Sequence, residues 1–95
     1  MSKTIMVVDD EKRLVSLVES YLTQEGYRVV SAYNGKEALN VARREKPDLI
    51  VLDLNLPVLS GVEVCRIVRS RPATSHIPII MLTARATEDD LLLGL

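Results

Sequence analysis

Residues 48–57 read DLIVLDLNLP, a four-residue apolar run between two aspartates, with a proline at the end of the stretch. Two other short apolar runs, TIMVV at residues 4–8 and IIML at residues 79–82, have the same character. Continuous apolar runs of this length are typical of strands that are buried on both faces of a parallel sheet. A fourth run, YRVVSA at residues 27–32, contains more polar residues, so we expect it near an edge of the sheet.

Helical patterns separate these four runs. After the first run, apolar residues recur with the spacing of one helix face. They are Leu14, Leu17, Val18, Tyr21 and Leu22. Asn34 and Ser60 are each followed three residues later by a glutamate, a pattern that predicts the start of a helix. Thr87, with Asp90 after it, predicts a fourth helix. The order βαβαβαβα predicts an α/β fold, a doubly wound parallel sheet with helices on both faces.

Composition limits the classes of protein to consider. The chain has 95 residues, of which 47% are hydrophobic and 26% charged, which excludes a disordered or collagen-like chain. The single Cys65 excludes an intrachain disulfide and a multi-cysteine zinc site. Twelve basic and thirteen acidic residues provide no general field for nucleic acid, and no apolar run approaches the ~20 residues of a membrane span. We expect one cytoplasmic domain over residues 1–95, binding neither nucleic acid nor membrane.

Three aspartates and a hydroxyl group follow the predicted strands. Asp9 and Asp10 come after the first run, Asp53 ends the third, and Thr83 follows the fourth. Taken singly, an aspartate at such a position can cap a helix or open a turn. Together at one edge of a parallel sheet, three carboxylates repel one another unless a cation neutralises them. Oxygen ligands without His or Cys favour Mg²⁺ over zinc, and such a site suits a phosphoryl group.

Glycine-based phosphate motifs are missing at this edge. The first glycine is Gly26, so neither G-x-G-x-x-G nor G-x-x-x-x-G-K follows the first strand. A phosphate placed directly against Asp9 and Asp10 would be repelled. We therefore expect the phosphoryl group to arrive with Mg²⁺ or to be formed covalently on a carboxylate.

Four motifs carry a resemblance to a known family. They are VVDDE at residues 7–11, DLIVLDLNLP at 48–57, Ser60-Gly61, and PIIMLTA at 78–84. In order and spacing they closely resemble the receiver domain of two-component response regulators, over the whole chain. The resemblance implies a flavodoxin-like fold with strand order 2-1-3-4. Because the chain ends at Leu95, we expect the family's fifth strand and fifth helix, with a lysine that pairs with the phosphoryl group, to be missing.

The resemblance also implies how a phosphoryl group would be handled. Asp53 would be the phosphoacceptor, taking the group from a phosphohistidine of a sensor histidine kinase or phosphotransfer protein. Thr83 would contact the phosphoryl group and act as a switch, while the small Ala84 would leave access to it. Such a domain is a phosphoacceptor and not an enzyme, with self-catalysed transfer and slow autodephosphorylation at most.

The implied cofactor is Mg²⁺. Its ligands would be Asp10, the Asp53 carboxylate and the backbone carbonyl of Asn55. Asp9 would contribute through a water molecule.

Two other functions are considered beside the receiver domain, and the chain itself is one expected partner. An enzyme of the haloacid-dehalogenase type would need Asp-x-Asp after the first strand and a cap, whereas Asp9 and Asp10 are adjacent and no insertion is long enough. A receiver-like interaction module without phosphorylation, whose acids only cap helices, stays open because of the missing lysine. The apolar edge of the fourth strand predicts self-association.

Overall fold

The computed structural model of the chain describes residues 2–82. Strands and helices alternate along this part in the order β1 (Thr4–Val8), α1 (Lys12–Gln24), β2 (Arg28–Ala32), α2 (Gly35–Glu45), β3 (Leu49–Asp53), α3 (Gly61–Ser70) and β4 (Ile79–Leu82). The expected helix that starts at Thr87 lies outside the described residues, as do Thr83 and Ala84.

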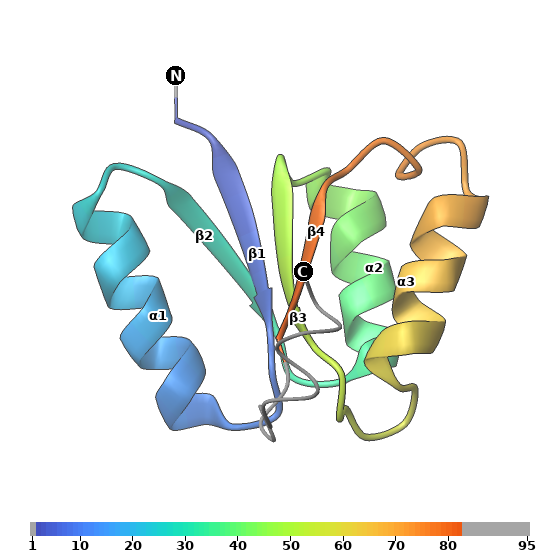
Figure 1. Ribbon diagram of the computed structural model, residues 1–95. Helices are drawn as coiled ribbons and strands as arrows, with labels where there is room; N and C mark the ends of the chain where they lie inside the picture. Colours follow the sequence, from blue (N-terminus) through green and yellow to red (C-terminus); the bar gives the residue numbers. More distant parts are fainter. Residues whose placement is uncertain (1, 83–95) are drawn as a thin grey trace, which may run out of the picture.

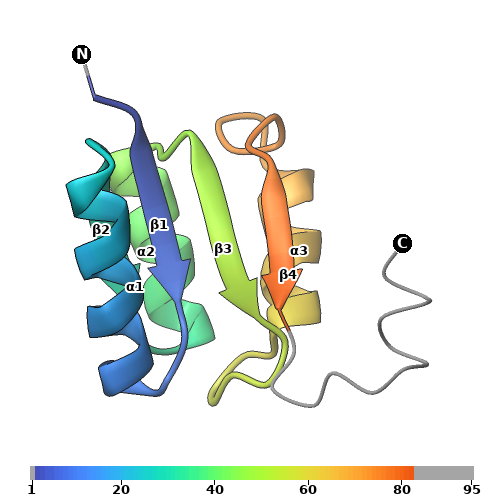
Figure 2. The same cartoon turned by 60° about the vertical axis from the view of Figure 1, so that its left-hand side comes forward.

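All neighbouring strands are parallel, as the sequence pattern predicted, and their order is β2-β1-β3-β4, as the family resemblance implied. The sheet forms the middle layer, with α1 on one face and α2 and α3 on the other (Figure 1). Seen from the side of α1, the arrowheads of β1, β3 and β4 point toward the same end of the sheet (Figure 2). The polar residues that follow the strands therefore lie along one edge.

The central strand β1 explains why its sequence is apolar at nearly every position. All five of its residues are buried. Met6 and Val8 pack in the core beneath α2 and α3, whereas Ile5 and Val7 pack in the core beneath α1. Both faces of the strand are therefore buried, and β2 with its more polar residues lies at the edge, as predicted.

The predicted starts of α2 and α3 are confirmed, with Asn34 and Ser60 as the N-cap residues. The side chains of Asn34 and Ser60 each accept a hydrogen bond from the backbone N–H three residues later, at 2.8 and 3.3 Å. The Glu37 carboxylate accepts a hydrogen bond from Tyr33 N–H at 2.9 Å, one residue before the cap. The residue that precedes the cap is therefore tied to the first turn of α2.

Strand β4 lies at the other edge of the sheet that residues 2–82 form, and its Ile80, Met81 and Leu82 are exposed. An exposed apolar edge can pair with another strand. A single chain does not test the self-association expected through this strand, which stays a prediction. No helix within residues 2–82 is both long and apolar enough to cross a membrane.

Core packing generates the first prediction. Leu52 is fully buried in the core beneath α2 and α3, so Leu52→Ala removes apolar contacts and leaves a cavity. We expect the free energy of unfolding to fall by about 2–5 kcal/mol, measured by urea denaturation with circular dichroism. Leu17→Ala is the matched control, because Leu17 is 54% exposed. An equal loss in the two variants would contradict the prediction.

Candidate metal centre

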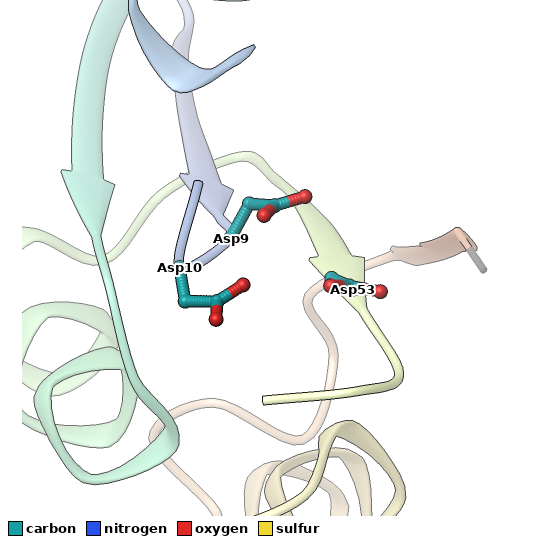
Figure 3. A group of neighbouring side chains, drawn as sticks. All are labelled: Asp9, Asp10 and Asp53. Atoms are coloured by element: carbon teal, nitrogen blue, oxygen red, sulfur yellow. The ribbon is translucent and has the colours of Figure 1, made fainter. Parts of the chain in front are cut away.

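The pairing of β1 with β3 brings the three aspartates together. Val8 lies opposite Leu52 in the parallel register, so Asp9 follows β1 at the level where Asp53 ends β3. One carboxylate oxygen from each of Asp9, Asp10 and Asp53 lies within 4.8 Å of the other two (Figure 3). The predicted convergence of these side chains at the carboxyl edge of the sheet is confirmed.

Backbone N–H groups hold two of the three carboxylates. Asp9 Oδ1 accepts a hydrogen bond from Glu11 N–H at 2.9 Å, and Asp53 Oδ1 accepts one from Asn55 N–H at 3.3 Å. Neither Asp9 nor Asp10 is the N-cap residue of α1, because that residue is Glu11, and the Glu11 side chain makes no capping hydrogen bond. The explanation of Asp9 and Asp10 as helix caps is therefore wrong, and a turn within the chain orients Asp9 instead.

The charge of this cluster is not balanced by the described part of the protein. The ion pairs within residues 2–82 join Glu45 to Arg28 and Arg44, and Glu63 to Arg66, and none of them involves the three aspartates. Burial raises the pKa of Asp9 above its ordinary value of 3.8, the hydrogen bond from Glu11 N–H opposes this, and the charges of Asp53 and Asp10 raise it further. A bound cation would remove the repulsion that these charges produce.

An open pocket of about 400 Å³ lies over the carboxylates. Its lining combines acids, one amide and two apolar side chains, namely Asp9, Asp10, Glu11, Leu14, Asp53, Asn55 and Leu82. Asp53 is 5% exposed, whereas Asp10 and Asn55 are exposed at the pocket. The pocket thus offers the hard oxygen donors that Mg²⁺ prefers, beside one buried carboxylate.

Sequence reasoning missed three residues of the pocket, Glu11, Leu14 and Leu82. Leu14 belongs to the apolar stripe of α1 and Leu82 ends β4, so their sequence patterns predict a role in packing alone. Two features of the sequence could have pointed to the two leucines. Leu14 lies in the first turn of α1, close after the acidic residues, and Leu82 is the last residue of β4. Thr83 and Ala84 lie outside the described residues, so their expected roles stay predictions.

The raised pKa of Asp9 generates a second prediction. Because folding raises this pKa, the ionised carboxyl destabilises the folded protein at pH values above its folded-state pKa, and the effect disappears as the pH falls below the ordinary value of 3.8. Asp9→Asn keeps the Oδ1 acceptor for Glu11 N–H and removes the charge. We expect a higher melting temperature at pH 7 in EDTA, and a smaller gain at lower pH.

Glu19→Gln is the control for this experiment, because it removes one negative charge from an exposed position on α1. It should leave the melting temperature nearly unchanged. An Asp9→Asn variant that melts at or below the wild-type temperature at pH 7 would contradict the proposed repulsion.

A family model for the response regulator receiver domain matches residues 5–95. Among curated proteins, the chain is 50% identical over 95 residues to the alkaline phosphatase synthesis transcriptional regulatory protein PhoP of Bacillus subtilis (strain 168). That match covers 100% of this chain and 39% of the relative, so the chain spans about two fifths of the relative's length.

Solved receiver structures share the fold. A response regulator of Methanoculleus marisnigri JR1 has an N-terminal domain 35% identical in sequence, with a TM-score of 0.85 over 95% of this chain and 74% of that one. The receiver domain of a Pseudomonas aeruginosa PAO1 sensor histidine kinase, with magnesium coordinated in its active-site cleft, is 34% identical, with a TM-score of 0.86 over 97% and 75%. From the fold, the site and these matches, the chain belongs to the response regulator receiver domain family.

Proposed function

We propose that Asp53 of this receiver domain accepts a phosphoryl group from a phosphohistidine of a sensor histidine kinase or phosphotransfer protein, with Mg²⁺ bound beside it. The observation that carries the proposal is the cluster of three carboxylates within 4.8 Å of one another, which no ion pair among residues 2–82 neutralises. A purely structural set of acids would be expected to have such partners or to cap a helix.

Asp53 fits the nucleophile better than its two neighbours. It is the last residue of a central strand, it is 5% exposed, and Asn55 N–H holds one of its oxygens. Asp10, by contrast, is exposed on a turn. An Asp53 oxygen would attack the phosphorus, the P–N bond to the imidazole would break, and an aspartyl phosphate would form. The rigid strand supplies the fixed position that such a transfer needs.

The donor set fits Mg²⁺. Asp10, the Asp53 carboxylate and the Asn55 carbonyl would hold the ion directly, and Asp9 would act through water. When bound, Mg²⁺ would neutralise the carboxylates and the incoming phosphoryl oxygens. The magnesium in the cleft of the Pseudomonas receiver, at 34% identity, supports this assignment.

We also propose roles for the two residues that follow β4. Thr83 would contact a phosphoryl oxygen and report its presence, and Ala84 would leave access to the phosphate. The cytoplasmic location stays a prediction, and so does self-association through β4, which light scattering at increasing protein concentration tests. A monodisperse monomer at the highest concentration would contradict self-association.

Phosphorylation is tested directly by intact mass. We expect the wild type, incubated with acetyl phosphate and Mg²⁺, to gain one phosphoryl group, because Asp53 offers a buried and oriented carboxylate. Asp53→Asn should show no gain, and Glu19→Gln should behave as the wild type. A folded wild-type chain that gains no mass would favour the receiver-like interaction module, and a gain that persists in Asp53→Asn would place the acceptor elsewhere.

Metal binding is tested by melting. We expect millimolar Mg²⁺ to raise the melting temperature of the wild type, because binding relieves the repulsion among the aspartates. EDTA should abolish the increase, and Asp10→Asn should reduce it strongly. If Asp10→Asn and the wild type respond equally to Mg²⁺, the ion does not bind at this cluster.

A further inference from the structure

We propose that Gly35, the first residue of α2, is a positioning residue for the magnesium site. It would act through residues 54–60, which connect β3 to α3 and which we call the acceptor loop (Figure 1). The inference rests on the proposed function, because the acceptor loop carries Asn55, whose carbonyl is a proposed Mg²⁺ ligand. No metal contact of Gly35 itself is involved.

The start of α2 lies directly against the acceptor loop. Gly35 is buried, and its N–H donates a hydrogen bond to the Pro57 carbonyl at 3.4 Å. A Cβ atom at Gly35 would lie 2.6 Å from Leu59 Cβ and would overlap the Leu59 carbonyl oxygen. Only a glycine allows this approach, because the atoms in the way belong to the backbone and to a Cβ and cannot swing aside.

The acceptor loop does not adopt its conformation through its own preferences. Val58, at the tip, has a φ of 72°, which is unfavourable for a β-branched residue. Leu59 N–H donates to the Pro57 carbonyl at 2.7 Å, which closes a γ-turn around Val58, and γ-turns with positive φ are rare and strained. Val58 is 76% exposed, so burial of its own side chain does not compensate for this strain. Such conformations persist only where neighbouring contacts impose them.

Several anchors impose the loop conformation, and at its start Leu54 N–H donates a hydrogen bond to the Leu82 carbonyl at 2.9 Å. Leu56 is buried in the core and Leu59 packs against it. At the far end, Gly61 N–H donates to the Leu54 carbonyl at 2.9 Å. A further anchor is Gly35, which belongs to a different element and lies outside the carboxylate cluster. A change at Gly35 should therefore move the loop backbone, and with it both the Asn55 carbonyl and the Asn55 N–H that holds Asp53 Oδ1, while Asp9 and Asp10 stay in place.

The first test compares two glycine-to-alanine variants of the full chain. Gly35→Ala should push the acceptor loop away and raise the Kd for Mg²⁺, measured by calorimetry, by about tenfold, the size of effect seen when groups that orient metal ligands are changed. Gly26→Ala is the control. Gly26 has a φ of 94°, and a Cβ at this position would meet no atom within 4 Å, so alanine strains the backbone without a clash. It should lower the melting temperature and leave the Kd unchanged.

A second pair of variants changes the exposed tip of the acceptor loop. If Gly35→Ala does not fold, this pair still tests whether the loop conformation sets the Kd for Mg²⁺. Val58→Pro forbids a φ of 72°, because proline holds φ near about −65°. It should raise the Kd for Mg²⁺ as Gly35→Ala does. Val58→Gly permits the observed φ without strain and should bind Mg²⁺ at least as tightly as the wild type.

The outcomes separate this inference from the proposed function. A wild type that binds no Mg²⁺ overturns the proposed function. If the wild type binds Mg²⁺ and either Gly35→Ala or Val58→Pro is folded by circular dichroism with the wild-type Kd, only the positioning role is overturned. A lower melting temperature with an unchanged Kd would show that Gly35 contributes to stability alone.

Discussion

The parallel pairing of β1 with β3 is the constraint on which the rest of this structure depends. β1 lies between β2 and β3, and its alternating side chains fill the core on both faces of the sheet. A slip of one residue would move Met6 and Val8 from one core to the other, so the register with β3 is strongly specified. The same register places Asp9 and Asp10 beside Asp53. Apolar burial therefore determines where the carboxylates meet.

The cluster opposes the stability of the fold that creates it. Burial and neighbouring carboxylates raise the pKa of Asp9, and no ion pair within the described chain compensates. Packing on both faces of the sheet holds the aspartates together despite this repulsion. A local conflict of this kind, imposed by a well-packed scaffold, is typical of functional sites, where binding of a ligand removes the conflict. The strained tip of the acceptor loop at Val58 is a second conflict, close to the first in the chain.

Much of the fold and the site could be predicted because their signals are local. Short apolar runs predicted the strands, the more polar run predicted the edge strand β2, and the aspartates at the ends of the first and third runs predicted the carboxylate cluster. The cap residues of α2 and α3 were also predicted, but the hydrogen-bond partner of the Glu37 carboxylate was not. Asn34 caps α2 as expected, yet Glu37 bonds to Tyr33, because an i, i+3 spacing does not say which nearby N–H the carboxylate reaches. The positive φ of Val58 has no sequence signal, since valine disfavours it.

The sequence by itself determined the order of strands and helices, the resemblance to receiver domains and the identity of the three aspartates. These features depend on periodicity, on residue type and on which residues follow each strand, all of which can be read within a few positions. Only the tertiary structure decided the separation of the carboxylates, the raised pKa of Asp9 and the contact of Gly35 with the acceptor loop. Those depend on strand register and helix packing between segments that are far apart in the chain, and no local pattern encodes such distances.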